Sequence, residues 1–271
     1  MSKTEYWVHS MDPFLFQFTE NFGIRYYGLA YALGFLAGMW LLHLFCKHGK
    51  AALTPEQQSF TITAMMIGVL LGGRLGYSLF YALDDTLHRP WVIFQVWKGG
   101  MASHGGFIGV LVACWWVAKK LKLSFLELGD LLCPLVPPGI MLGRIANFIN
   151  GELWGKITNV SWAVIFPQSV MPGTPFDQIA ARHPSQLYEA GLEGALLLIY
   201  SQWRLWKTNV LNQPGRLTGE FLIIYAVVRI LGEQFREPDA PLIMDLSRGI
   251  FYSLFLFAGG LYLILRSRNT P

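Results

Sequence analysis

Residues 143–155 are Gly143-Arg144-Ile145-Ala146-Asn147-Phe148-Ile149-Asn150-Gly151-Glu152-Leu153-Trp154-Gly155, and they end a strongly apolar run with an arginine, two amides and a carboxylate. A charged side chain at the centre of a membrane helix costs at least about 2.5 to 3.5 kcal/mol, so an arginine there requires an anionic partner. We therefore interpret Arg144 as functional, with a carboxylate or an anionic ligand as its partner. The phosphate of a lipid is the ligand that best fits a membrane setting.

The composition around this segment is that of a membrane protein. The apolar fraction is 53%, the charged fraction is 14% and the mean hydropathy is +0.39, whereas soluble domains carry about 25% charged residues. Several apolar runs approach the ~20 residues that cross a hydrocarbon core. We expect an all-α, polytopic integral membrane protein with about seven transmembrane helices, over residues 26–46, 60–83, 105–118, 126–148, 187–206, 219–235 and 250–265.

Basic residues in the short loops predict the orientation, because lysine and arginine concentrate on the cytoplasmic side of membrane proteins. With seven spans, one side receives the basic groups of residues 47–50, 119–122, 204–216 and 266–268. The N-terminus is therefore expected outside and the C-terminus in the cytoplasm.

One long connection, residues 150–183, stands apart from the short loops. A loop longer than ~15 residues in a compact protein is usually functional or disordered. This one carries enough apolar side chains for a small packed head, with a strand at residues 162–166. Apart from this head, we expect residues 1–271 to form a single integral membrane domain.

Two classes of site find no support in the sequence. The cysteines, Cys46, Cys114 and Cys133, lie in apolar segments without the spacing of a metal site or a disulfide framework, so we interpret them as core residues. The net charge of +4 is spread along helix ends, which suits anionic lipid and gives no sign of nucleic-acid binding.

The stretch Arg89–Gly100 is too short to span a membrane and contains Trp91, Phe94 and Trp97. Aromatic rings favour the headgroup level of a bilayer. We expect an interfacial or re-entrant helix here.

Arginines inside or at the ends of the predicted spans could bind an anionic ligand, since guanidinium binds phosphate through two parallel hydrogen bonds and stays charged in any site. These are Arg74, Arg144 and Arg229. The alternative is neutralisation by an internal acid, for which Glu189, Glu193, Glu220 and Glu233 are available. For Arg74 the two interpretations are equal, and for Arg144 with Arg229 we favour ligand binding.

His104 lies in an apolar region and is followed by Gly105 and Gly106, which permit close backbone approach. A lone histidine in such a region is more often a structural donor than a catalyst. Its pKa near neutrality would nevertheless let it accept a proton from a thiol or a hydroxyl.

Two further polar segments belong to helix ends. Arg229, Glu233 and Arg236 are spaced i, i+4 and i+7, which places them on one face if the helix continues through them. The segment His183-Pro184-Ser185-Gln186-Leu187-Tyr188-Glu189 predicts a helix start with Ser185 as its N-cap.

Together, these motifs resemble the signatures of the bacterial prolipoprotein diacylglyceryl transferase family. The resemblance covers nearly the whole chain. It is carried by residues 143–155, His104-Gly105-Gly106, Arg25-Tyr26-Tyr27-Gly28, residues 183–189 and Phe235-Arg236-Glu237-Pro238-Asp239.

The resemblance implies an enzyme of the bacterial inner membrane with seven spans, a periplasmic N-terminus and a periplasmic head. It would transfer the diacylglyceryl group of phosphatidylglycerol to the lipobox cysteine of a prolipoprotein signal peptide. The reaction forms a thioether and releases glycerol phosphate. No metal or organic cofactor is expected, and the partners are membrane lipid and the peptide.

The resemblance also implies roles for individual residues. His104, Arg144 and Arg229 would be catalytic, His104 as the base for the thiol or as a positioning group. Residues that would bind substrate are Arg144, Tyr27, Asn147, Asn150, Glu152, Gly155, Glu233 and Arg236.

The main alternative function is a lipid or anion transporter whose arginines line a pathway. We find no internal repeat, although inverted repeats are common among secondary transporters. A scaffold with buried ion pairs is the other alternative, and the glycine-flanked His104 argues against it.

Overall fold

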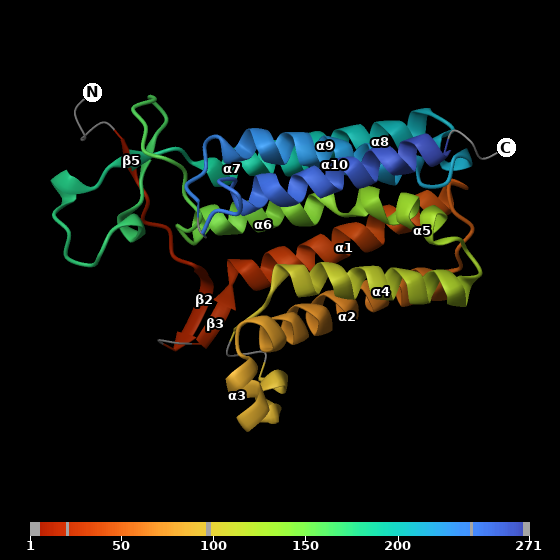
Figure 1. The fold of residues 1–271 in the computed structure, drawn as a ribbon, viewed down its shortest axis with the longest axis horizontal. Coiled ribbons are helices and arrows are strands. Elements are labelled where there is room, and N and C mark those ends of the chain that lie inside the picture. Colours follow the sequence, from red (N-terminus) through yellow and green to blue (C-terminus); the bar gives the residue numbers. More distant parts are fainter. Residues whose placement is uncertain (1–5, 20–21, 96–98, 239–240, 268–271) are drawn as a thin grey trace. The chain divides into compact units, whose positions relative to one another are not determined.

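The computed structural model describes residues 6–19, 22–95, 99–238 and 241–267. The fold is mostly helical, with a few short strands (Figure 1). The chain divides into two compact units, one of Met1–Gly38 with Leu132–Pro271 and one of Met39–Leu131. We call them the discontinuous unit and the central unit, and each is described by itself.

The central unit is built on the pairing of α2 (Pro55–Phe80) with α4 (Ser103–Leu121), and α5 (Phe125–Leu132) follows. A capping box starts α2, because Gln57 N donates to Thr54 Oγ1 at 3.3 Å and Thr54 N donates to Gln57 Oε1 at 2.9 Å. Glycines let the two helices approach: a Cβ on Gly72 would lie 2.3 Å from the Gly105 carbonyl oxygen. The glycine that follows His104 is therefore required by helix packing.

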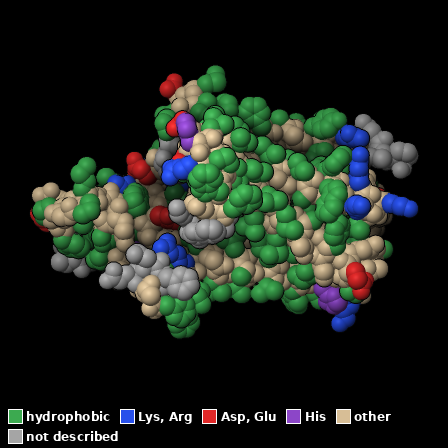
Figure 2. All heavy atoms as spheres, turned by 90° about the horizontal axis from the view of Figure 1, so that it is seen from below, with side chains coloured by type: hydrophobic (Ala, Val, Ile, Leu, Met, Phe, Trp, Pro, Cys, Tyr) green, Lys and Arg blue, Asp and Glu red, His purple; other side chains and the backbone are tan. Residues whose placement is uncertain are grey.

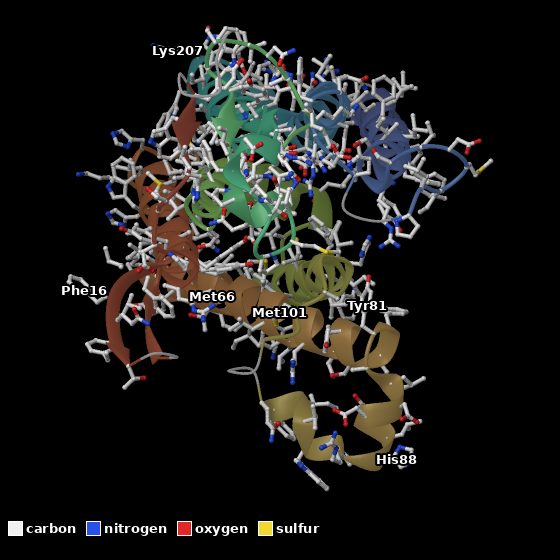
Figure 3. All side chains as sticks on the ribbon, turned by 90° about the vertical axis from the view of Figure 1, so that its left-hand side faces the viewer. Phe16, Met66, Tyr81, His88, Met101 and Lys207 are labelled. Carbon is white, nitrogen blue, oxygen red and sulfur yellow. The ribbon has the colours of Figure 1, made fainter. Side chains whose placement is uncertain are left out.

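The connection between α2 and α4 contains α3 (Leu83–His88) and a short 3-10 helix, η2 (Pro90–Phe94). Figure 3 shows it between the labelled Tyr81 and Met101. Several of its large apolar side chains are exposed, with Phe94 at 75%. The predicted interfacial segment is thus helical over part of its length, and its Trp97 and Lys98 lie outside the described residues.

The discontinuous unit holds the longer helices of the rest of the chain. They are α1 (Tyr26–Lys47), which begins in this unit, α6 (Pro137–Ile149), α7 (Ser185–Glu189), the π-helix η7 (Ala190–Leu196), α8 (Leu197–Lys207), α9 (Arg216–Glu233) and α10 (Arg248–Ser267). The series from α7 to α8 is continuous and packs against α6 and α9 (Figure 1). A Cβ on Gly219 would lie 2.8 Å from the Gly260 carbonyl oxygen, so glycine lets α9 and α10 pack closely.

The same unit contains the strands, which form two small sheets. They are β1 (Trp7–Val8), β2 (Phe14–Thr19), β3 (Phe22–Arg25), β4 (Val164–Ile165) and β5 (Ala181–Arg182). In the sheet of order β1-β4-β5, β1 runs parallel to β4 and β5 antiparallel to it, while β2 and β3 form an antiparallel hairpin. Figure 3 shows Phe16 on this hairpin, and its side chain is 61% exposed.

The head has a small apolar core, which consists of Ala163, Ile165, Ile179 and Ala181. The strand predicted at residues 162–166 is confirmed as β4, whereas the strands that pair with it and the β2–β3 hairpin were not predicted. His9 follows β1 and fastens it to α6, because its Nε2 donates to the Phe148 carbonyl oxygen at 2.7 Å.

Three helices in the described part of the chain are long and apolar enough to cross a membrane: Tyr26–Lys47, Pro55–Phe80 and Arg248–Ser267. The number rises to four if Phe125–Leu135 and Pro137–Ile149, which are bent by 41° at Val136, count as one broken span. The other predicted spans lie on α4, on α7 to α8 and on α9. Hydrophobic side chains cover much of the surface in Figure 2, as expected where lipid is the solvent.

Candidate functional site

Arg144 on α6 meets two carboxylates that are fully buried. Its Nη2 donates to Glu193 Oε2 at 2.9 Å and its Nε donates to the same oxygen at 3.2 Å. Its Nη1 lies 2.9 Å from Glu189 Oε2, and both glutamate side chains are 0% exposed. The partner that the sequence required for Arg144 is thus a pair of internal acids.

Arg229 on α9 reaches the same two carboxylates from the other side. Its Nη1 donates to Glu189 Oε1 at 2.6 Å and to Glu193 Oε1 at 3.2 Å, and its Nη2 forms a short hydrogen bond to Glu233 Oε1. Arg236 Nη1 also donates to Glu189 Oε1, at 3.3 Å. We call Arg144, Glu189, Glu193, Arg229, Glu233 and Arg236 the internal ion cluster.

Charges balance within the internal ion cluster, since its guanidinium groups and carboxylates are equal in number. Neutralisation by internal acids, the alternative to ligand binding, is therefore present in the structure for Arg144 and Arg229. These ion pairs do not use every N–H donor of the arginines, because each guanidinium carries five N–H groups. Arg144 is also the most accessible of these arginines, with 17% of its side chain exposed against 11% for Arg229 and 6% for Arg236.

Local backbone geometry brings the two glutamates to the arginines. Glu189 ends α7 and Glu193 lies in the π-helix η7, a form that occurs mostly as short segments at functional sites. Gly194 follows Glu193, and a Cβ there would lie 2.5 Å from the Met141 Cβ of α6. Because Met141 precedes Arg144 by one turn, this glycine contact holds α6 close enough for the ion pairs.

Helix α10 closes another side of the internal ion cluster. A Cβ on Gly249 would lie 2.2 Å from Glu233 Oε1 and 2.9 Å from Arg229 Nη2. Any larger residue at position 249 would therefore displace that pair. From the sequence, Glu189 and Glu193 have no predicted role beyond neutralisation, and Gly194 and Gly249 have no predicted role. The spacing of two acids by four residues in an apolar run was the signal available for the glutamates.

A second polar group lies where α6 ends. Asn147 Nδ2 donates to Glu152 Oε1 at 2.9 Å and forms a short hydrogen bond to the Tyr27 hydroxyl. The Asn150 Oδ1 atom is buried and has no hydrogen-bond partner among the described residues. The structure therefore joins three of the four predicted pocket residues directly and leaves a buried acceptor on the fourth.

The loop that carries Glu152 is held from α7. Gly151 and Leu153 have φ angles of 65° and 55°, which is an uncommon conformation for leucine. Gln186 Nε2 donates to the Glu152 carbonyl oxygen at 2.6 Å, and Ser185 Oγ donates to the Leu153 carbonyl oxygen at 3.1 Å. The N-cap role predicted for Ser185 is therefore wrong: Pro184 holds the cap position, and Ser185 fastens the loop instead.

Gly155 lies where three chain segments cross. Its N donates to the His183 carbonyl oxygen at 2.9 Å, and Lys156 N donates to the Phe235 carbonyl oxygen at 2.8 Å. A Cβ on Gly155 would lie 2.5 Å from that Phe235 oxygen, so the crossing has no space for a side chain. The structure gives Gly155 a packing role at the edge of the polar group.

The expected helical face of Arg229, Glu233 and Arg236 is corrected by the structure. Helix α9 ends at Glu233, and Arg236 forms a β-bridge with Gly155. The spacing argument is wrong for Arg236, yet the turn after α9 still directs its guanidinium to Glu189.

The remaining predicted residues belong to the central unit. His104 lies in the first turn of α4 and is partly buried. Arg74 is 4% exposed and donates to backbone carbonyl oxygens of Ile93 at 2.9 Å, of Gly100 at 3.0 Å, and of Val92 and Gly99. Among the described residues Arg74 forms no ion pair with an acid, and it fixes the connection before α4. Cys114 and Cys133 are buried, as expected of core residues, whereas Cys46 is only partly buried.

Comparison with known proteins shows the family of this chain. Residues 13–266 match the family model described as prolipoprotein diacylglyceryl transferase. Similar proteins are the phosphatidylglycerol–prolipoprotein diacylglyceryl transferases of Legionella pneumophila strain Paris, 45% identical over 81% of both chains, and of Nitratidesulfovibrio vulgaris, 44% identical over 90% of both. The transferase of Cereibacter sphaeroides is 42% identical over 96% of this chain and 97% of its own.

Proposed function

This chain belongs to the prolipoprotein diacylglyceryl transferase family, and we propose that it transfers the diacylglyceryl group of phosphatidylglycerol to prolipoproteins. The family assignment agrees with the resemblance identified from the sequence. It favours a membrane transferase over a transporter or a scaffold.

The observation that supports this reaction best is the internal ion cluster. A buried set of arginines at the end of apolar helices suits an anionic lipid phosphate, and the glutamates hold the guanidinium planes in fixed orientations. In the proposal, the phosphodiester accepts hydrogen bonds from N–H groups of Arg144 and Arg229 that the glutamates do not use. Preorganised donors of this kind act on charge that develops in the transition state.

The proposed step is a displacement at carbon. The lipobox cysteine loses its proton, and its sulfur attacks the glyceryl carbon that carries the phosphate oxygen. A C–S bond forms, the C–O bond breaks, and its electron pair leaves with glycerol phosphate. His104 takes the thiol proton, and the released glycerol phosphate carries an additional negative charge, which the arginines stabilise.

Around this step, Tyr27, Asn147, Asn150 and Glu152 form the polar pocket for the headgroup in our proposal. Support comes from the hydrogen bonds of Asn147 to Tyr27 and Glu152 and from the buried acceptor on Asn150. Gly155 shapes the pocket edge, and Glu233 with Arg236 orients the reacting arginines.

We further propose that the chain is one integral membrane domain of the bacterial inner membrane, with seven spans. The N-terminus and the head at about 150–183 lie in the periplasm, and the C-terminus lies in the cytoplasm. Support comes from the apolar helices and from the basic loops that alternate along the sequence.

The function is tested by incubating the purified chain with a lipobox peptide and with phosphatidylglycerol that is labelled in its diacylglyceryl group. Transfer of the label to the peptide is then measured. The peptide with cysteine should gain the label and glycerol phosphate should appear in equal amount. The same peptide with serine should stay unlabelled, because a hydroxyl is far less acidic than a thiol. Equal labelling of both peptides would exclude thiolate attack, and movement of labelled lipid across vesicles without any transfer would favour the transporter.

A further inference from the structure

A second arginine–glutamate group lies at the other end of α9 from the internal ion cluster. Arg204 donates to both oxygens of Glu220, with Nε to Oε2 and Nη2 to Oε1 each at 2.6 Å. Arg216 Nε donates to Glu220 Oε1 at 2.8 Å. We call Arg204, Arg216 and Glu220 the basic triad.

The hydrogen bonds of the basic triad leave one guanidinium only partly used. Arg204 Nη1 donates to Thr208 Oγ1 at 3.1 Å, and the Tyr200 hydroxyl donates to Glu220 Oε2 at 3.0 Å. These contacts occupy every nitrogen of Arg204 and both oxygens of Glu220. Within the part of the chain that the structure describes, neither Nη atom of Arg216 has a hydrogen-bond partner.

Charges do not balance in the basic triad, in contrast to the internal ion cluster. Two guanidinium groups, which stay ionised in proteins, share one carboxylate, so the group carries an excess of one positive charge. The side chains are largely removed from solvent, with Arg204 at 19%, Arg216 at 20% and Glu220 at 10% exposed. A partly buried excess charge requires an anion.

The position of the triad selects the class of anion. Arg204 lies in the last turn of α8 and Arg216 starts α9, so the triad lies at the loop end of this helix pair. Arg216 starts α9 and Arg229 lies 13 residues further along it, which corresponds to about 20 Å, so the two arginine groups lie toward opposite ends of the helix. In the topology proposed above, they face opposite leaflets.

Apolar surface lies beside the triad on the same helix. Ile199 and Trp203 are one turn apart on α8, and they are 70% and 54% exposed. The ring of Trp203 lies against that of Tyr200, with centroids 6.1 Å apart, and the Tyr200 hydroxyl donates to Glu220 of the triad. A ligand with a phosphate and hydrocarbon chains would match both surfaces, whereas a soluble anion would use only the charged one.

We propose that the basic triad binds the phosphate of an anionic phospholipid in the leaflet opposite to the internal ion cluster, with the Nη groups of Arg216 as its donors. The acyl chains lie along Ile199 and Trp203. The inference depends on the membrane placement of the helices and is independent of the transfer reaction.

The test is binding of phosphatidic acid to the purified full chain in neutral detergent, measured by native mass spectrometry and by titration. Arg216→Gln should weaken binding about tenfold or more, the effect of losing a hydrogen bond from a charged donor. The matched control is Lys207→Gln, which removes an exposed charge at the same helix end (Figure 3) without touching the triad. Its affinity should stay within about twofold of the unchanged chain.

Two further binding measurements test the proposal. The unchanged chain should prefer phosphatidic acid to phosphatidylcholine of the same chain length, and this comparison requires no variant. Inorganic phosphate should compete only weakly. Equal binding of the two lipids, equal losses in Arg216→Gln and Lys207→Gln, or full displacement by inorganic phosphate would each overturn the proposal.

Discussion

Arg229 Nη1 on α9 lies 2.6 Å from Glu189 Oε1 at the end of α7, and this contact joins segments 40 residues apart in the sequence. Glu189 accepts from Arg229 and Arg236 and also lies against Arg144, so one fully buried carboxylate fixes three guanidinium groups. The orientation of the arginines and the stability of the helix packing therefore depend on the same side chain.

Arg144→Ala should reduce transfer by about 10²-fold or more, because the phosphate loses a preorganised charged donor. Arg144→Lys should also be poor, since a point charge does not reproduce the planar fork. Initial rates with labelled phosphatidylglycerol measure both. Arg89→Ala is the control, because Arg89 is 60% exposed and, among the residues that the structure describes, its ion pair is with Asp85 one turn earlier. A well-folded Arg144→Ala chain with nearly normal turnover would refute the assignment.

Glu189→Gln should destabilise the fold by about 3 to 5 kcal/mol, since it leaves buried arginines with an excess charge. Thermal unfolding in detergent measures the loss as a lower Tm. Asp84→Asn removes a carboxylate that is 95% exposed and should change stability by less than about 0.5 kcal/mol. If Glu189→Gln unfolded at the same temperature as Asp84→Asn, the internal ion cluster would not contribute to the stability of the fold.

Two glycines of the π-helix should respond in opposite directions to alanine. Gly194→Ala forces a Cβ within 2.5 Å of Met141 and should cost about 1 to 3 kcal/mol. Gly191→Ala meets nothing within 4 Å and should stabilise by about 0.5 to 1 kcal/mol. Unfolding temperatures compare the pair, and Met141→Ala should not rescue Gly194→Ala, because the contacting Cβ and Cα atoms of residue 141 remain. Equal effects at both positions would argue against close contact between η7 and α6.

His104→Asn should lower the rate by about 10² to 10⁴-fold at neutral pH if His104 is the base for the thiol. Raising the pH should then restore part of the rate, because the free thiolate forms unaided as the pH approaches ~8.5. pH–rate profiles of His104→Asn and His104→Gln test this. A high rate whose pH dependence matches that of the unchanged chain would exclude His104 as the base. It would favour His104 as a hydrogen-bond donor.

Reporter fusions should place the C-terminus and the head on opposite sides of the membrane. A fusion at the C-terminus should report cytoplasm, and an insertion near Pro172 should report the periplasm, because the basic loops alternate along the chain. Alkaline phosphatase and fluorescent protein reporters distinguish the compartments. A cytoplasmic signal from the Pro172 insertion would contradict the span count and the position of the head.

The sequence predicted that the buried arginines need anionic partners, but it did not predict which groups those partners are. An arginine in an apolar run requires an anion by energy alone, so Arg144 and Arg229 could be identified without a structure. The carboxylate partners could not be assigned, because Glu189, Glu193, Glu220 and Glu233 all had suitable positions in the sequence. Only the packing of η7 on α6 selects among them.

Local patterns were least reliable where tertiary contacts override them. Ser185 has the residue type and position of an N-cap, but a backbone carbonyl in a distant loop binds its hydroxyl. Arg74 could have bound an acid or a ligand, and it binds carbonyl oxygens of a connection that no periodicity describes. The short strands β1 and β5 likewise depend on pairing with β4 and have no signal of their own.

The attachment of His9 to Phe148 has a consequence for how the chain is made. The two residues are separated by 139 positions, so at about 5 to 20 residues per second the N-terminal strand emerges roughly 7 to 30 s before its acceptor and β4 exist. Throughout that interval the strand has an unpaired edge. A bulky tag that slows pairing of the N-terminal strand would therefore delay folding of the head rather than folding of the helices.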